Sequence, residues 1–293
     1  MKILFSMLLV ASTASADFAT YDFQHSWDSE DSTTTRHLIG YGTTLNESEI
    51  GIKHGTYNVA DANGSTNFNE TRLFGSSNFS SGGIDGYVGT LYNSNWDTPS
   101  YDVTGWWTPI EPLYIEANTS GSIVETTNAI NSEISLSSVG FSIDVMILDN
   151  VTVVGGFNSF SFSDGNTKNI FTTKFVYSFL SVDGLYAYVE NKSFSNDFNP
   201  PEYFAPSELI RRMVFIGYNT SFLDRQFSLR SKYGIGSQTL PFAGSEFVDL
   251  LEIKITGSIG SNTRITGEFL TTGDKGDYPY RYNTITVGFE YYF

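Results

Sequence analysis

The 293-residue chain contains no cysteine, so disulfide bonds and thiolate chemistry are excluded from its structure and function. Positive charge is also scarce, because 16 Lys and Arg stand against 32 Asp and Glu, for a formal net charge of -16 at pH 7. Phosphate backbones bind to surfaces of the opposite sign. We therefore expect no nucleic-acid partner.

Long hydrophobic runs are missing as well, since no segment approaches the roughly 18 consecutive apolar residues that a membrane-spanning helix needs. The short apolar run Ile3 to Ala11 is followed by the small residues Ala14-Ser15-Ala16. This order is typical of a secretory signal peptide, with a core helix as the alternative. We expect residues 1–16 to be a signal peptide and residues 17–293 to form one exported domain.

Histidine is rare, with three residues in the chain: His25, His37 and His54. None has a Ser or Asp partner at a spacing typical of a catalytic constellation. No ligand spacing typical of a metal site and no phosphate-cradling glycine motif occurs either. We expect no enzymatic activity, no metal and no cofactor, with a lipid-active barrel enzyme as the least favoured alternative.

The last ten residues show what the chain does contain. From Thr284 to Phe293 apolar and polar side chains alternate, with Ile285, Val287 and Phe289 on one face and Thr or Glu on the other. A strand places successive side chains on opposite faces, so the apolar face can meet lipid and the polar face a wet interior. Soluble barrels usually have the opposite sense. The ending predicts the closing strand of an outer-membrane β-barrel, with an aromatic terminus that the outer-membrane assembly machinery recognises.

Period-2 segments separated by turn signals occur along the whole chain. Each approaches the ~9–11 residues that a tilted strand needs to cross a bilayer. They predict an all-β, antiparallel up-and-down transmembrane barrel of about 16 strands, with 14 or 18 as open alternatives. The expected strands are 17–27, 34–45, 49–57, 68–77, 84–92, 101–109, 113–124, 138–148, 151–162, 169–178, 185–194, 211–221, 227–236, 247–259, 263–272 and 282–293.

The connections alternate between tight turns and longer loops, which is the layout of bacterial outer-membrane barrels and places both termini in the periplasm. The longer loops include Asn58 to Asn67, Glu125 to Ser137, Ser195 to Ile210 and Ser237 to Glu246. The tight turns are expected around Asn46, Gly82, Glu111, Asp149, Val182, Asp224 and Ser261.

Parity within each strand predicts which side chains line the lumen. Outward Lys or Arg near mid-bilayer would cost about 2–4 kcal/mol each, so charged residues are assigned inward. They form either ion pairs that rigidify the wall or a selectivity lining for a polar solute. The inward tyrosines either stack on sugar rings or fill space. The predicted pore-lining residues are Lys53, Arg72, Tyr87, Trp106, Tyr114, Glu116, Asp144, Lys174, Tyr186, Tyr188, Glu190, Lys192, Arg230, Lys232, Glu252, Lys254, Arg264, Glu268 and Glu290.

Three short motifs between Trp106 and Arg230 carry a resemblance to a known family. They are Glu125-Thr126-Thr127-Asn128-Ala129-Ile130, Ser163-Asp164-Gly165-Asn166 and Asn199-Pro200-Pro201-Glu202-Tyr203-Phe204. In this order they resemble the C-terminal barrels of exopolysaccharide-export proteins, those for cellulose and poly-N-acetylglucosamine. The resemblance implies a barrel of about sixteen strands through which a polysaccharide leaves. It departs from the family in one respect: here the signal peptide leads directly into the first strand, with no helical-repeat domain between them.

These observations together predict an outer-membrane channel for a polar solute, most favourably a saccharide or exopolysaccharide chain. A general diffusion porin and a structural or adhesive surface barrel are the alternatives. The expected partners are outer-membrane lipid, the assembly machinery and a separately encoded periplasmic export component. The proline-containing loop from Ser195 to Ile210 is expected to fold inward or cover the mouth and gate conduction.

Overall fold

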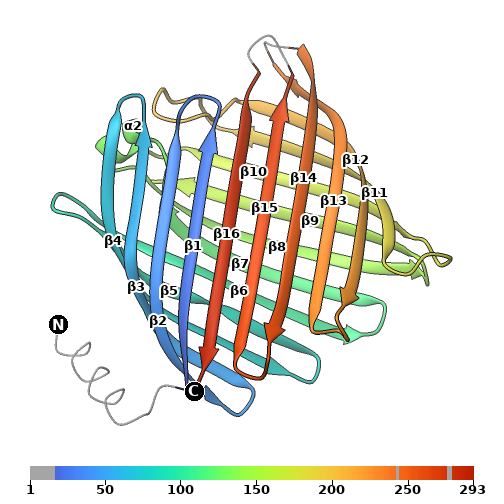
Figure 1. The fold of residues 1–293 in the computed structure, drawn as a ribbon. Coiled ribbons are helices and arrows are strands. Elements are labelled where there is room, and N and C mark those ends of the chain that lie inside the picture. The colour runs from blue at the N-terminus through green and yellow to red at the C-terminus, as the bar shows by residue number, and fades with distance from the viewer. Residues whose placement is uncertain (1–16, 242–243, 276–278) are drawn as a thin grey trace.

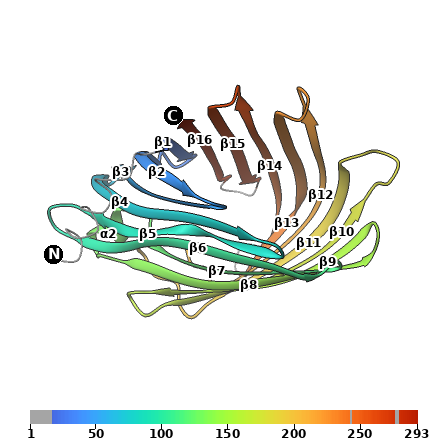
Figure 2. The same cartoon turned by 90° about the horizontal axis from the view of Figure 1, so that it is seen from below.

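The chain forms a closed barrel of sixteen antiparallel strands, as the alternating pattern predicts (Figure 1). The computed structural model describes residues 17–241, 244–275 and 279–293. Each strand pairs with its neighbours in sequence, and β1 pairs with β16 from Phe18 opposite Tyr292 to Asp28 opposite Tyr282. Figure 2 shows these two strands side by side where the wall closes. The predicted signal peptide, residues 1–16, lies outside the described residues.

The elements follow one another with no departure from up-and-down order. They are β1 (Phe18–Asp28), β2 (Thr33–Leu45), β3 (Ser48–Asp61), β4 (Gly64–Phe79), β5 (Gly82–Tyr92), β6 (Asp97–Ile110), β7 (Leu113–Ile123), α2 (Thr127–Asn131), β8 (Ser135–Leu148), β9 (Val151–Phe162), β10 (Thr167–Ser178), β11 (Leu185–Asn196), β12 (Glu208–Phe222), β13 (Phe227–Leu240), β14 (Gly244–Ile259), β15 (Thr263–Asp274) and β16 (Arg281–Tyr292).

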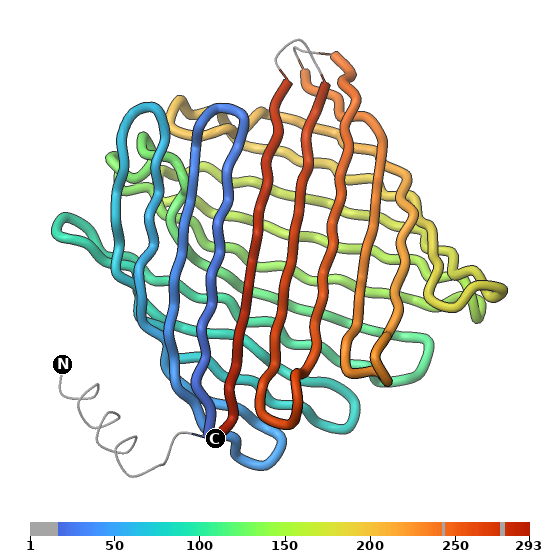
Figure 3. The backbone as a smooth tube through the Cα atoms, viewed as in Figure 1, coloured from blue at the N-terminus to red at the C-terminus, as the bar shows by residue number. Residues whose placement is uncertain are grey.

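The tight turns lie where they are predicted, at the end of the barrel that also holds the first and last strand ends (Figure 3). Asn46 has φ 59° and Gly260 has φ 64°, the left-handed conformation that tight hairpin turns require. The β7–β8 connection, predicted as the longer loop Glu125 to Ser137, contains the five-residue helix α2.

Two predicted loops are wrong in extent. The segment Asn58 to Asn67 is paired strand up to the turn between Asp61 and Gly64, and Ser237 to Glu246 is mostly paired strand of β13 and β14. Most outward side chains in the paired parts of these segments are polar, for example Asn58, Asn67 and Thr239, and such polarity resembles that of a loop. The strands continue above the apolar part of the wall, so polarity here marks a change of surroundings, not the end of the strand.

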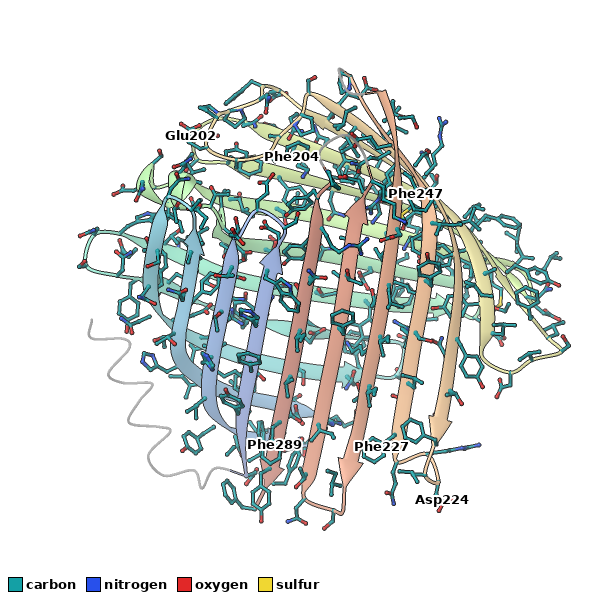
Figure 4. The ribbon with its side chains drawn as sticks, turned by 45° about the horizontal axis from the view of Figure 1, so that its top comes forward. Glu202, Phe204, Asp224, Phe227, Phe247 and Phe289 are labelled. Carbon is teal, nitrogen blue, oxygen red and sulfur yellow. The ribbon has the colours of Figure 1, made fainter. Side chains whose placement is uncertain are left out.

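The outer face carries an apolar band. In β8, Val139, Phe141, Ile143 and Val145 alternate with inward residues and are all exposed on the isolated barrel. Aromatic rings lie near both rims: Figure 4 shows Phe227 and Phe289 at the end of the termini and Phe247 at the opposite end. A band of apolar residues flanked by aromatic girdles is the lipid-facing surface of a membrane barrel.

On the inner face, aromatic rings lie flat across glycines of the neighbouring strand. A Cβ atom on Gly217 would approach Tyr186 Cζ to 2.2 Å, and one on Gly234 would approach Phe215 Cε1 to 2.2 Å. Such pairs let a large ring lie along the wall without projecting across the lumen. The glycines of β12 and β13 therefore determine how much lumen remains open beside these rings.

Candidate functional site: the barrel lumen and its loop layer

A cavity of about 1010 Å³ occupies the lumen near the end that holds the termini. Its wall comes from β7 to β13 and from the β10–β11 turn, which includes Phe179 and Asp183. Nine of the predicted lining residues contribute to it: Tyr114, Glu116, Asp144, Lys174, Tyr186, Tyr188, Lys192, Arg230 and Lys232. Whether a solute meets these side chains stays a prediction.

Glu190 is the centre of a cationic cluster on the inner wall. Its carboxylate lies 3.6 Å from Lys174 Nζ, 3.6 Å from Lys192 Nζ and 3.8 Å from Arg211. The Glu190 side chain is 5% exposed, while the three cations are partly exposed. Sequence interpretation missed Arg211. It has the same inward parity in β12 as Met213 and Phe215, whose side chains are buried. One carboxylate thus holds three cations of β10, β11 and β12 in place.

A row of cross-strand ion pairs continues along β13 to β16. Lys232 Nζ lies 2.5 Å from Glu252, Lys254 Nζ 3.7 Å from Glu268, and Arg264 3.4 Å from Glu290. All six side chains are predicted lining residues. Because each pair joins adjacent strands on one face, it supports the register of the sheet as well as the charge pattern.

A second cluster lies on β2 to β6, with Glu70 fully buried at its centre. Glu70 accepts from Arg72 Nε at 2.6 Å and from Ser100 Oγ at 2.8 Å, and Arg36 Nε lies 3.0 Å away. The guanidinium of Arg72 stacks on the Tyr87 ring at 3.7 Å. The predicted residues Arg72 and Tyr87 therefore belong to a packed polar group. Sequence interpretation did not include its centre Glu70, although Glu70 lies two residues from Arg72 on the same strand β4.

Lys53 of β3 forms a separate ion pair on the inner wall, beside Arg72 of the neighbouring strand β4. Its Nζ donates to Asp22 Oδ2 at 2.6 Å and lies 4.7 Å from the centre of the Phe74 ring. Asp22 belongs to β1 and Lys53 to β3, so this ion pair spans the intervening strand β2. The pair links the strands near the closure of the barrel.

Four carboxylates on adjacent strands β5 to β8 have no such cation. Among the described residues, no Lys or Arg nitrogen lies within 4.0 Å of Asp85, Asp102, Glu116 or Asp144. Glu116 accepts from Tyr114 Oη at 2.8 Å, which leaves its charge in place. This part of the wall is therefore negative, whereas the wall from β10 to β16 carries both signs.

The predicted aromatic residues differ in how much ring surface they offer. Tyr188 stacks on Phe215 at 4.4 Å and 10° and is 9% exposed, so it fills space in the wall. Tyr186 is half-buried and covers Gly217 with one face. Trp106 covers Gly83 in the same way. Of the five predicted rings, Tyr186 and Trp106 are the two whose geometry suits stacking against a sugar.

Helix α2 and its flanking residues fold inward from the β7–β8 connection and contact β3 and β4. Ile130 joins a buried cluster with Tyr57, Val59 and Phe68, whose side chains share the inward parity of their strands. Burial of such side chains is worth roughly 1.5–3 kcal/mol each, so this contact is a stable part of the fold.

Polar contacts fix the same segment. Thr126 is the N-cap, and its Oγ1 accepts from Ala129 N at 3.2 Å. The carboxylate of Asp61 accepts from Thr127 N at 3.0 Å and from the Thr127 hydroxyl. The Tyr57 hydroxyl donates to Glu125. The helix is thus anchored on the inner wall by residues far away in sequence.

The connection 197–207 packs against the α2 segment. Tyr203 and Ala205 share a buried cluster with Val124, Ala129 and Ile134. Figure 4 shows Glu202 and Phe204 at the end of the barrel opposite the termini. We call the two packed connections, 124–134 and 197–207, the loop layer. The expectation that this loop folds towards the mouth agrees with this packing, and its gating role stays a prediction.

The three motifs that carry the family resemblance meet in the loop layer. Thr126 Oγ1 donates to Glu202 O at 2.7 Å, and the Tyr203 hydroxyl donates to Asp164 at 3.0 Å. Asn166 Nδ2 contacts the same hydroxyl at 3.1 Å. Burial, joined by the nearby carboxylate of Asp164, raises the pKa of Tyr203 to about 12, so this phenol keeps its proton at neutral pH.

The histidines lie on the outer face of the barrel, away from the lumen. His25 Nδ1 pairs with Thr35 Oγ1, His37 Nδ1 with the Tyr21 hydroxyl and His54 Nδ1 with Thr71 Oγ1, each at 2.9 Å. Among the described residues, no group of three or more His, Asp or Glu side chains could hold a metal ion. None of the helices in the described ranges is long and apolar enough to cross a membrane.

Comparison with known proteins supports the fold. No protein-family model matches the chain, and no curated protein matches it. The solved structure of a bacterial polysaccharide outer membrane secretin is similar, with a TM-score of 0.71 and 9% identity over 96% of this chain and 100% of that chain. The likeness to barrels of exopolysaccharide-export proteins is thereby confirmed for the fold.

Two solved structures from Pseudomonas aeruginosa are more distant. OccD3 has a TM-score of 0.49 at 7% identity, covering 94% of this chain and 91% of that chain. OpdQ has a TM-score of 0.44 at 11% identity, covering 93% and 98%.

Proposed function

We propose that this protein is a non-enzymatic outer-membrane channel that passes a polar solute, most favourably a saccharide chain. The observation that carries the proposal is the polar cavity of about 1010 Å³ inside a closed membrane barrel. Carboxylates and cations there offer hydrogen-bond acceptors and donors for hydroxyl groups. Tyr186 adds a ring that lies flat on the wall, and a sugar can place its C–H face against such a ring.

The structural likeness also supports a saccharide as the solute. A barrel of the same length with a TM-score of 0.71 carries the name of a polysaccharide secretin. In a bacterial outer membrane, the end with tight turns and both termini faces the periplasm. In that orientation the cavity is the entrance for cargo, and a separately encoded periplasmic export component would dock there. The loop layer then lies at the outer end and covers part of the exit.

Planar-bilayer recording tests the proposal. The purified protein, inserted from one side, should conduct ions, and neutral oligosaccharides added on the cavity side should block the current in a concentration-dependent way. Tyr186→Ala should weaken the block with little change in the open current. Tyr177→Ala, which removes an exposed outward ring of β10, is the matched control.

The loop layer favours a second candidate, a surface barrel without transport, because it closes part of one end with packed side chains. A variant that lacks residues 197–207 distinguishes the two. If this variant folds and still shows no conductance at any voltage, the channel proposal is overturned.

A further inference from the structure

All three histidines of the chain lie on one patch of the outer surface. His25, His37 and His54 belong to the adjacent strands β1, β2 and β3 and have outward parity. Each occupies the strand position beside a threonine of the next strand: His25 opposite Thr35, His37 opposite Thr56 and His54 opposite Thr71. We call these three residues the histidine row.

The row follows the upper edge of the apolar band. The next outward residue towards the termini is Phe23 below His25, Ile39 below His37 and Ile52 below His54. Above the row, β2 to β4 present Thr and Asn outward, for example Thr56, Asn58 and Asn69. Each histidine therefore lies at the boundary between hydrocarbon and headgroups, where an ionisable side chain on the lipid face costs least.

The rings are held in place. Their Nδ1 atoms form the three 2.9 Å hydrogen bonds to hydroxyl groups described above, and within the described ranges no hydrogen bond to an Nε2 atom is found. His25 stacks between Phe23 at 6.4 Å and Trp27 at 5.4 Å, and Phe23 also contacts His37 at 5.0 Å. Fixed rings with one free nitrogen edge lose little entropy when they bind a ligand.

No negative charge on the neighbouring outward positions offsets the positive charge of the row when its imidazoles are protonated. Across the described outward positions of β1 to β4 there is no carboxylate, and Tyr21 and Tyr41 are the other titratable groups there. On β16 the outward Arg281 is held by Asp249 at 2.9 Å. Acidic residues occur above the row in the β1–β2 connection, as Glu30 and Asp31, both exposed.

We propose that the histidine row binds the phosphate groups of the outer-leaflet glycolipid. Imidazolium N–H groups donate charge-assisted hydrogen bonds to phosphate oxygens, and three of them in a row at headgroup height match a phosphorylated lipid lying against the wall. A charged imidazolium binds a phosphate oxygen more strongly than a neutral imidazole does. Binding therefore increases when the row is protonated.

The inference uses the membrane placement proposed above but not the transport of any cargo, and its test needs neither bilayer orientation nor conduction. Native mass spectrometry of the detergent-solubilised protein with bis-phosphorylated lipid A, at pH 5.5 and pH 7.5, measures the fraction of protein with bound lipid. Each protonated histidine should tighten binding about fivefold. H25Q/H37Q/H54Q should lose the gain at pH 5.5 and match the wild type at pH 7.5.

Three comparisons make the result decisive. H25K/H37K/H54K should bind at both pH values, because lysine keeps its charge. T173Q/N191Q, which changes outward polar residues of β10 and β11, should behave as the wild type. Lipid A without phosphates should show no pH dependence, and inorganic phosphate added in excess should compete. Equal lipid binding by the wild type and the glutamine variant at pH 5.5, or equal binding of dephosphorylated lipid A, overturns the inference.

Discussion

The effect of a charged residue on the inner wall depends on whether a residue of opposite charge lies close to it. Glu190 has three cations within 3.8 Å, whereas Asp102 and Glu116 have none within 4.0 Å among the described residues. Breaking a buried ion pair leaves an uncompensated charge, which costs about 3–5 kcal/mol when both partners are fully desolvated. The cations around Glu190 are 21–33% exposed, so water reduces this cost. Compensated residues thus stabilise the wall, and uncompensated ones set its potential.

The uncompensated carboxylates should make the channel prefer cations. Replacing Asp102 and Glu116 by their amides, D102N/E116Q, should lower the K⁺/Cl⁻ permeability ratio roughly twofold per charge, the effect of a unit charge about 8 Å from the ion in a water-like medium. Reversal potentials across a KCl gradient measure the ratio. Asp224→Asn, in the turn between β12 and β13, is the matched control and should change nothing. A ratio unaffected by D102N/E116Q would contradict this reading of the wall.

Gly217, which lies under the Tyr186 ring, should prove more sensitive to substitution than Gly288, an inner glycine with no ring over it. Gly217→Val places a side chain where Tyr186 lies, so either the ring turns into the lumen or the strand pairing distorts, at about 1–3 kcal/mol. Single-channel conductance should fall, and the unfolding midpoint in urea should drop. Gly288→Ala is the control, because its added Cβ would meet only ordinary contacts at 3.7 Å. If both variants behave alike, the ring does not constrain the lumen.

At the scale of elements, the loop layer is held on the inner wall by buried side chains and by the contact between Asp61 and Thr127. The cysteine-free chain permits a direct test with D61C/T127C, since the two native side chains contact each other and a disulfide can replace that contact. Under oxidising conditions the conductance should equal that of the wild type. After reduction it should rise, because both native hydrogen bonds are missing. Wild-type conductance should be indifferent to reductant.

The sequence predicts the strands well, because each strand must alternate between lipid-facing and lumen-facing side chains. It predicts poorly the contacts between segments that are distant in sequence. Strand number and turn positions follow from alternation between lipid and lumen, because every strand experiences both. The ends of β3 and β4 do not follow, since outward side chains such as Asn58 and Asn67 become polar above the lipid while the pairing continues.

The contacts within the loop layer could not be predicted from the local sequence pattern. Helix α2 has five residues, too few for a helical period, and its cap partner Asp61 lies 66 positions away. Inward parity identified Lys174, Glu190 and Lys192, but it did not identify Arg211, which completes their cluster. Likewise the three family motifs were visible as short strings, and their mutual contact around Tyr203 appears only in three dimensions.

For the whole molecule, closure is the property on which the rest depends. The last residue takes part in it, because Phe293 N donates to Asp17 O at 2.9 Å and the rings of Tyr291 and Phe293 meet edge to face at 5.5 Å. The outward terminal aromatics are also what we expect the outer-membrane assembly machinery to recognise.

Deleting Phe293 should therefore separate assembly from stability. In cells, the amount of heat-modifiable protein in the outer membrane should fall to a minor fraction, because recognition is lost. In detergent the same variant should refold, since one of many closing contacts is missing. Phe247→Ala, an aromatic residue of the opposite rim, should leave cellular assembly unaffected. Normal outer-membrane levels of the Phe293 deletion would show that the assembly machinery reads another signal.

Strand β4 has 16 residues, from Gly64 to Phe79. At about 3.3 Å per residue and a tilt near 40°, it reaches roughly 40 Å along the barrel axis, whereas the hydrocarbon-facing zone is about 25 Å tall. Strand β4 is therefore on the order of 15 Å longer, along the barrel axis, than the hydrocarbon-facing zone is tall. Cargo that leaves beneath α2 would be released among the sugars of the cell surface, already clear of the lipid and its phosphates.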